Sequence, residues 1–217
     1  MNGGGSLQLS AFSEECNVLG PGRRAVVWVQ GCPLRCRGCV STDTLSFDGG
    51  QSVSIAELAA KIADITGIEG VTLSGGEPFS QAAGLTDLIA QFKQARPELS
   101  VMSYSGYRLR WLRAHGSPAQ AKLLGKLDIL IDGPYRDDLH ASLRWRGSSN
   151  QTVQFLTNRY SALAEAADMS AGLEFALLPD GGMRWMGVPP VRNFRADLEA
   201  ALLARGVSWT EEGEDRP

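Results

Sequence analysis

Short apolar runs alternate with amphipathic helical patterns along most of this 217-residue chain. The run at residues 25–29 is continuous and bounded by turns, which predicts a strand buried on both faces. Further strands are expected over 7–12, 70–73, 99–103, 127–131 and 153–156, with helices over about 55–65, 85–96, 108–124 and 162–167. The alternation of strands and helices predicts an α/β fold with parallel strands and right-handed crossovers.

The pattern changes near residue 170. Two short strands joined by Pro179-Asp180-Gly181-Gly182 predict a hairpin, and apolar spacing predicts a last helix over about 194–203. We therefore expect a core domain over residues 1–170 and a hairpin and helix extension over 171–217, packed on the same domain. Two roles remain open for the extension: it caps an edge of the sheet, or it forms part of a surface on which a partner docks.

Charge and hydropathy narrow the classes of partner. The chain has 21 Lys and Arg against 24 Asp and Glu, a net charge of −3, which does not favour nucleic acid or an anionic membrane. No segment approaches the ~18 apolar residues of a membrane span, and no secretion signal precedes Arg23. A cytoplasmic protein is expected.

Three of the four cysteines lie within eight residues, directly after the first buried strand. Cys32, Cys36 and Cys39 form a C-x3-C-x2-C pattern, and thiolates are soft ligands for zinc or iron–sulfur clusters. Structural zinc takes four ligands, commonly as separated pairs, and the remaining candidates form no second pair: Cys16, His115 and His140. The pattern favours a cubane with one open iron, while a zinc-stabilised binding module and a small iron–sulfur electron carrier remain as alternatives.

A second motif, Gly75-Gly76-Glu77-Pro78, follows the next buried strand. Two glycines let a ligand approach the backbone, and the carboxylate of Glu77 can accept hydrogen bonds from an ammonium group. Ligand sites collect at the carboxyl ends of parallel strands. We therefore expect the glycine turn and the cysteine loop to form one site.

With these two motifs, the sequence resembles the radical S-adenosylmethionine enzymes. More narrowly, it resembles the anaerobic ribonucleotide reductase activating enzymes and their relatives with a 4Fe-4S single cluster domain. The narrower resemblance covers about residues 17–157 and also rests on residues 20–23, 28–32, 128–135 and 146–151. It implies a partial (β/α)6 radical S-adenosylmethionine barrel with a lateral opening beside the cluster.

The resemblance also implies the cofactors and the site. Cys32, Cys36 and Cys39 would hold a 4Fe-4S cluster, whose fourth iron is chelated by the amino and carboxylate groups of S-adenosylmethionine. Reductive cleavage would then give methionine and a 5′-deoxyadenosyl radical, which abstracts hydrogen from a substrate carbon. The turn residues Gly75, Gly76, Glu77 and Pro78 would hold the amino group. Candidates for binding the ribose or carboxylate are Ser103, Tyr104, Ser105, Asp132 and Asn150.

The implied partners are a protein substrate, a glycyl radical enzyme, and a flavodoxin- or ferredoxin-type reductant. A rival interpretation is an enzyme that modifies a peptide or a small-molecule natural-product precursor. The chain differs from the reductase activases at Val40 and Ser41, where they commonly carry an aromatic residue and Asn, and in its extension. Both differences bear on the substrate rather than on the cofactor.

Overall fold

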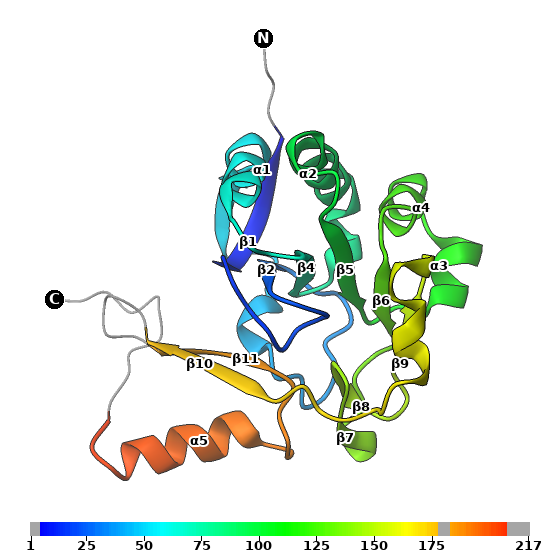
Figure 1. Ribbon diagram of the computed structural model, residues 1–217. Helices are drawn as coiled ribbons and strands as arrows, with labels where there is room; N and C mark the ends of the chain where they lie inside the picture. Colours follow the sequence, from blue (N-terminus) through cyan, green and yellow to red (C-terminus); the bar gives the residue numbers. More distant parts are fainter. Residues whose placement is uncertain (1–4, 178–182, 208–217) are drawn as a thin grey trace, which may run out of the picture.

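A seven-stranded sheet forms the centre of the computed structural model, which describes residues 5–177 and 183–207 (Figure 1). The strand order is β3-β1-β2-β4-β5-β6-β9. These strands are β1 (Ser6–Ser13), β2 (Arg24–Val29), β3 (Gln51–Ser54), β4 (Gly70–Gly75), β5 (Ser100–Ser105), β6 (Ile129–Asp132) and β9 (Thr152–Phe155). Two separate strand pairs are β7 (His140–Leu143) with β8 (Arg146–Ser148), and β10 (Leu173–Leu177) with β11 (Met183–Gly187).

The α-helices are α1 (Ile55–Asp64), α2 (Ala82–Ala95), α3 (Leu109–His115), α4 (Pro118–Leu124) and α5 (Phe194–Leu203). Short 3-10 helices are η1 (Thr42–Thr44), η2 (Pro78–Gln81), η3 (Asp137–Leu139) and η4 (Asn158–Glu165). The last of these differs from the α-helix expected over 162–167. Its backbone is non-helical at Tyr160, whose buried hydroxyl donates to Ser100 Oγ at 2.8 Å, so tertiary contacts override the local helical pattern.

The predicted α/β class is confirmed, with β2, β4, β5 and β6 parallel in the middle of the sheet. The outer strands run antiparallel to their neighbours, whereas six regular strand–helix units would give parallel strands throughout. On one side, β1 runs antiparallel to both β2 and β3, and on the other β9 runs antiparallel to β6. A parallel connection needs a long crossover, and no α-helix lies between β1 and β2 or between β6 and β9.

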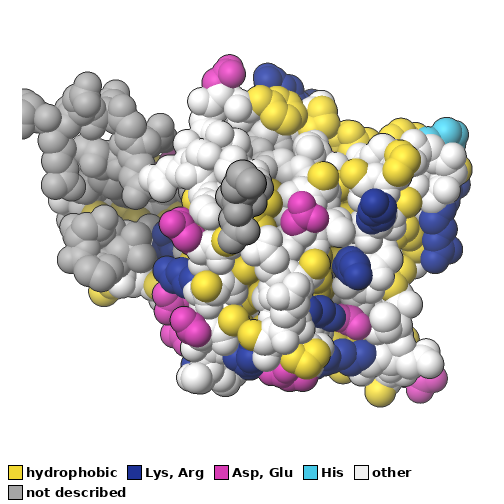
Figure 2. Space-filling model, turned by 90° about the horizontal axis from the view of Figure 1, so that it is seen from above, with side chains coloured by type: hydrophobic (Ala, Val, Ile, Leu, Met, Phe, Trp, Pro, Cys, Tyr) yellow, Lys and Arg dark blue, Asp and Glu magenta, His cyan; other side chains and the backbone are white. Residues whose placement is uncertain are grey.

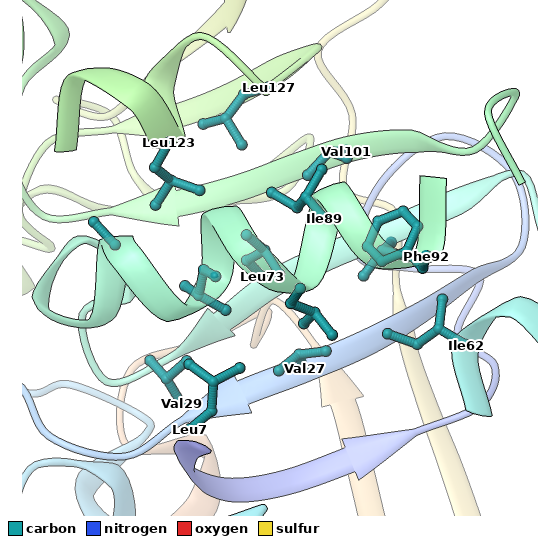
Figure 3. Close-up of a cluster of buried hydrophobic side chains, with 14 of the residues drawn as sticks. Leu7, Val27, Val29, Ile62, Leu73, Ile89, Phe92, Val101, Leu123 and Leu127 are labelled. Atoms are coloured by element: carbon teal, nitrogen blue, oxygen red, sulfur yellow. The ribbon is translucent and has the colours of Figure 1, made fainter. Parts of the chain in front are cut away.

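One face of the sheet is covered by α1, α2 and α4 (Figure 1). Ser54 begins α1 as an N-cap, because its hydroxyl accepts from Glu57 N at 3.5 Å, as the Ser–x–x–Glu spacing indicates. Figure 3 shows Ile89 and Phe92 of α2 among strand residues such as Leu73. Each fully buried side chain of this kind contributes about 1.5–3 kcal/mol, so this layer holds the strands in register.

The opposite face of the sheet carries the C-terminal hairpin β10–β11 (Figure 1). Met186 packs there with Cys16, which is 1% exposed, and with Val26 of β2. Glu174 accepts hydrogen bonds from Asn17 N at 2.7 Å and Asn17 Nδ2 at 2.5 Å. The described extension therefore covers a face of the sheet, and among the described residues neither β10 nor β11 pairs with an edge strand of it. The turn predicted at 179–182 lies outside the described residues.

A fully buried cation joins the amino ends of the parallel strands. Arg24 donates to Thr72 Oγ1 at 2.7 Å, Ser100 Oγ at 2.8 Å and Val71 O at 2.8 Å. Burial lowers the pKa of Arg24, and these acceptors compensate the buried guanidinium. Over the described ranges, no helix has the length and apolar character needed to cross a membrane.

Candidate functional site

The cysteine loop begins where β2 ends and is closed by backbone hydrogen bonds. Gly31 N donates to Thr44 O at 2.8 Å, and Cys32 N donates to Leu45 O at 3.1 Å. Gln30 reinforces the closure, since its Nε2 donates to Ser46 O at 2.7 Å. The loop is therefore fixed at its base, immediately beside Cys32.

The glycine turn at the end of β4 is hydrogen-bonded to the base of this loop. Gly76 N donates to Val29 O at 2.8 Å, and Glu77 N donates to Gly31 O at 2.9 Å. Because β2 and β4 are adjacent and parallel, both motifs leave the sheet at the same edge. The structure brings the two motifs together, as the sequence predicts.

The two glycines face this chain's own backbone. A Cβ on Gly76 would lie 2.3 Å from Gly31 O, and a Cβ on Gly75, whose φ is +97°, would lie 2.5 Å from Val29 O. We expected the missing side chains to make room for a ligand. A Cβ on Gly76 would meet the cysteine loop and a Cβ on Gly75 would meet β2, so packing within the chain already requires glycine at both positions. Ligand contact by the turn stays a prediction.

Glu77 is 1% exposed and already has three hydrogen-bond donors. Its Oε1 accepts from Phe79 N and Ser105 Oγ, both at 3.0 Å, and its Oε2 accepts from Gly106 N at 2.8 Å. Burial raises the pKa of Glu77 to about 7, against the opposing effect of these donors. The carboxylate of Glu77, for which we predict contact with an ammonium group, thus joins the turn to the end of β5. Pro78 is buried and begins η2.

The three cysteine thiols share one neighbourhood. Cys32 is buried, and Cys36 and Cys39 are partly exposed. Burial raises the pKa of Cys39, and the charges of Cys36 and Cys32 add to that rise. Burial likewise raises the pKa of Cys36, whereas a hydrogen bond with the backbone of Tyr135 lowers it. Each thiol that loses its proton thus makes ionisation of its neighbours harder unless a cation is bound among them.

The donor set fits an iron–sulfur cluster better than a zinc ion. Cys32, Cys36 and Cys39 lie within one short loop, whereas a structural zinc site takes four ligands around one ion, commonly as two separated pairs. A four-iron cluster is larger and takes thiolates at its separate irons, which suits three neighbouring thiols at a fixed loop.

Three further candidates are used within the protein. Ser103 Oγ donates to Tyr104 O at 3.0 Å, and Ser105 Oγ donates to Glu77. Asp132 Oδ2 accepts from Leu109 N, the first residue of α3, at 2.7 Å. Side chains alternate along a strand, so these three lie on the face that the helices cover, together with Val101 and Leu130. In this structure the polar groups of Ser103, Ser105 and Asp132 position local structure, and their contact with a ligand stays a prediction.

Tyr104 and Asn150 differ from those three residues. The Tyr104 hydroxyl and Asn150 Oδ1 are buried and have no hydrogen-bond partner among the described residues. Asn150 is held by its other atom, because Nδ2 donates to Pro134 O at 2.8 Å. Buried polar atoms are nearly always paired. These two atoms therefore retain the capacity to bind a ligand group.

Sequence reasoning gave too little weight to Tyr135 and His140. The Tyr135 hydroxyl lies 3.1 Å from His140 Nδ1, and His140 Nε2 is buried without a partner among the described residues. The backbone of Tyr135 also reaches Cys36. Tyr135 ends one of the stretches that resemble the activases, which is the signal that singles it out; for His140 the only signal is its place in the chain.

The family model described as "4Fe-4S single cluster domain" matches residues 18–154. The anaerobic ribonucleoside-triphosphate reductase-activating protein of Enterobacteria phage T4 is 32% identical over 141 residues, 63% of this chain and 86% of that protein. Its namesake from Escherichia coli K12 is 33% identical over 146 residues, 64% and 92% of the two chains.

Among solved structures, QueE from Escherichia coli is 18% identical and covers 46% of this chain and 53% of its own, with a TM-score of 0.35, too low to support an argument. The matched residues 18–154 include all three cysteines, the glycine turn and the parallel strands from which both arise. The chain therefore belongs to the 4Fe-4S single cluster domain family and is a radical S-adenosylmethionine enzyme related to the anaerobic ribonucleoside-triphosphate reductase-activating proteins.

Proposed function

We propose that this enzyme is an activase that abstracts hydrogen from a glycine of a glycyl radical enzyme. The observation that carries the proposal is the joined pair of motifs, in which Glu77 N donates to Gly31 O beside Cys32. The names of the T4 and Escherichia coli relatives support an activase. Reductase activation is the reaction that these names state for those proteins, and we extend it to this chain.

In this proposal, Cys32, Cys36 and Cys39 are the cluster ligands. A cluster held by these residues would supply the single electron needed for reductive cleavage of S-adenosylmethionine. Gly75 to Pro78 hold the amino group of S-adenosylmethionine through their backbone. Glu77 is a positioning residue, because its hydrogen bonds fix the turn against Gly106. Tyr104 of β5 and Asn150, between β8 and β9, have unpaired buried polar atoms, which would contact the ribose or the carboxylate of S-adenosylmethionine.

We further propose that residues 1–170 form the core domain and that residues 171–217 are an extension packed on it. An ion pair supports the packing of the extension on the core domain: Arg195 Nη1 of α5 lies 2.6 Å from Asp43 Oδ2 in the cysteine loop. Through this ion pair and the β10–β11 hairpin, the extension borders the site from the side opposite the helical layer. The substrate protein meets the extension as it approaches the site.

The test is anaerobic reconstitution of the wild type and of Cys32→Ala, Cys36→Ala and Cys39→Ala, with Cys16→Ala as a matched control. We expect about four irons per chain in the wild type and control, and loss of the cluster in each of the other three variants. With dithionite and S-adenosylmethionine, wild type and control should form 5′-deoxyadenosine.

The decisive arm adds a purified anaerobic ribonucleotide reductase and looks for a glycyl radical by electron paramagnetic resonance. A radical that appears only with the loaded wild type or control supports the activase. Formation of 5′-deoxyadenosine without any protein radical, together with a mass change in a small peptide, would favour the peptide-modifying alternative. Stoichiometric zinc in place of iron would refute both.

A further inference from the structure

A long basic segment lies in the middle of this acidic chain. From Leu99 to Leu127 the sequence contains no Asp or Glu, although the net charge of the whole chain is −3. The basic residues in this segment are Arg108, Arg110, Arg113, Lys122 and Lys126. None of the five forms an ion pair with another residue in the described ranges. Their charge is therefore not neutralised by the rest of the described molecule.

The three arginines share one surface hollow at α3. Arg108, Arg110 and Arg113 line a hollow of about 310 Å³, together with Leu109, Asp132, Thr152 and Gln154. The carboxylate of Asp132 is already used by Leu109 N and by Gln154 Nε2. Because three guanidinium groups and only one carboxylate line the hollow, its net charge is positive. Figure 2 looks onto the helical layer and shows Lys and Arg side chains at the edge where Figure 1 places α3.

An exposed aromatic residue lies on another side of α3, outside the lining of this hollow. Trp111 is 40% exposed, and its ring stacks on Tyr107, with centroids 4.7 Å apart, and on His115, at 5.6 Å. The stack fixes the indole without burying it. Tryptophan and arginine are the residues most enriched among the strongest contributors to protein interfaces. We call the three arginines that line the hollow, Arg108, Arg110 and Arg113, the α3 surface.

The α3 surface begins next to the cysteine loop. Gly106, two residues before Arg108, lies so close to Leu34 of the loop that a Cβ on it would be 2.2 Å from Leu34 Cδ1. The same residue donates its N–H to Glu77 at 2.8 Å. The surface therefore reaches the candidate site from the helical side, while the extension borders it from the other.

We propose that the α3 surface docks an acidic one-electron carrier protein, an inference that rests on the proposed function. Hydrogen abstraction needs the substrate carbon in direct contact with the adenosyl radical, whereas an electron crosses a layer of protein. A surface on the outside of α3, in a segment whose Gly106 contacts Leu34 of the cysteine loop, thus suits a carrier rather than a substrate. One electron leaves the reduced carrier and enters the oxidised cluster, with no bond made and no proton moved.

The probe is a flavodoxin of negative net charge, titrated anaerobically into the reconstituted enzyme at low and at near-physiological salt. Arg110→Glu combined with Arg113→Glu should weaken binding by about tenfold and reduce its salt dependence. The matched control is Lys93→Glu on α2, which makes the same charge change at a cation outside the α3 surface and should bind like the wild type.

Cleavage of S-adenosylmethionine driven by dithionite separates the two proposals, because dithionite needs no docking surface. If the wild type fails to cleave with dithionite, the proposed function is wrong. If the wild type cleaves and the ratio of flavodoxin-driven to dithionite-driven rate falls in the double variant, the docking surface is supported. Equal flavodoxin affinity in wild type and double variant would overturn it, as would a defect confined to binding of the glycyl radical enzyme.

Discussion

Gly76→Ala tests whether the two motifs act as one unit. The added methyl would lie 2.3 Å from Gly31 O and 2.9 Å from Thr44 O, whereas ordinary contacts begin near 3.4 Å. Both neighbours are backbone atoms in a loop closed by hydrogen bonds. The turn and the loop must therefore separate by about 1 Å. No left-handed φ is involved at Gly76, so the effect is steric.

The expected loss in the free energy of unfolding has two parts, overpacking and broken hydrogen bonds. Overpacking of this size costs about 1–3 kcal/mol. The bonds from Gly76 N to Val29 O and from Glu77 N to Gly31 O add about 1 kcal/mol each when they are lost. We expect a total loss of about 3–5 kcal/mol, a large part of the ~5–15 kcal/mol that stabilises a typical domain.

The assay is anaerobic urea unfolding of the cluster-free protein, followed by iron analysis after reconstitution. The control is Gly125→Ala at the end of α4, where a Cβ would meet nothing closer than 3.6 Å. The control should unfold like the wild type and load iron normally. If Gly76→Ala lowers the free energy of unfolding by less than about 1 kcal/mol, the turn does not position Cys32. The same conclusion follows if the variant is fully destabilised but its folded fraction binds iron normally.

Two other variants test buried groups. Glu77 has a pKa of about 7 in the folded protein against 4.5 ordinarily, so the native state holds an extra proton between those values and stability falls as pH rises through that window. Relative to Glu77→Gln, the cluster-free wild type should lose about 3 kcal/mol between pH 4 and pH 8; parallel pH profiles would disprove the raised pKa. Arg24→Met should cost about 3 kcal/mol in urea unfolding, yet the folded protein should still load iron, because Arg24 lies at the amino end of β2, away from the cysteine loop. Loss of iron from folded Arg24→Met would contradict that separation.

Local sequence patterns predicted much of the core correctly. The apolar run at 25–29 and the helical spacing of Leu85, Leu88, Ile89 and Phe92 indicate burial of single elements, and the structure buries them as expected. The order of strands and helices implied that two neighbouring parallel strands would end side by side. That rule alone predicted the meeting of the cysteine loop with the glycine turn.

The hydrogen-bond partners of the polar site residues come only from the tertiary structure. Ser103, Ser105 and Asp132 end strands, and the alternation of side chains turns all three toward the helices. Glu77 accepts from Gly106, 29 residues further along the chain. No local pattern reports that such a donor is near.

The sequence by itself determined the α/β class, the strands that carry the two motifs and the residue types available for a soft-ligand cluster. Hydrophobic periodicity is enough to predict these features because it indicates which side of a helix or strand is apolar and becomes buried. Only the tertiary structure decided the antiparallel outer strands, the packing of β10–β11 on a face of the sheet and the gathering of three arginines at one hollow. These features depend on contacts between segments far apart in the chain, whose free energies are fixed only when the segments meet.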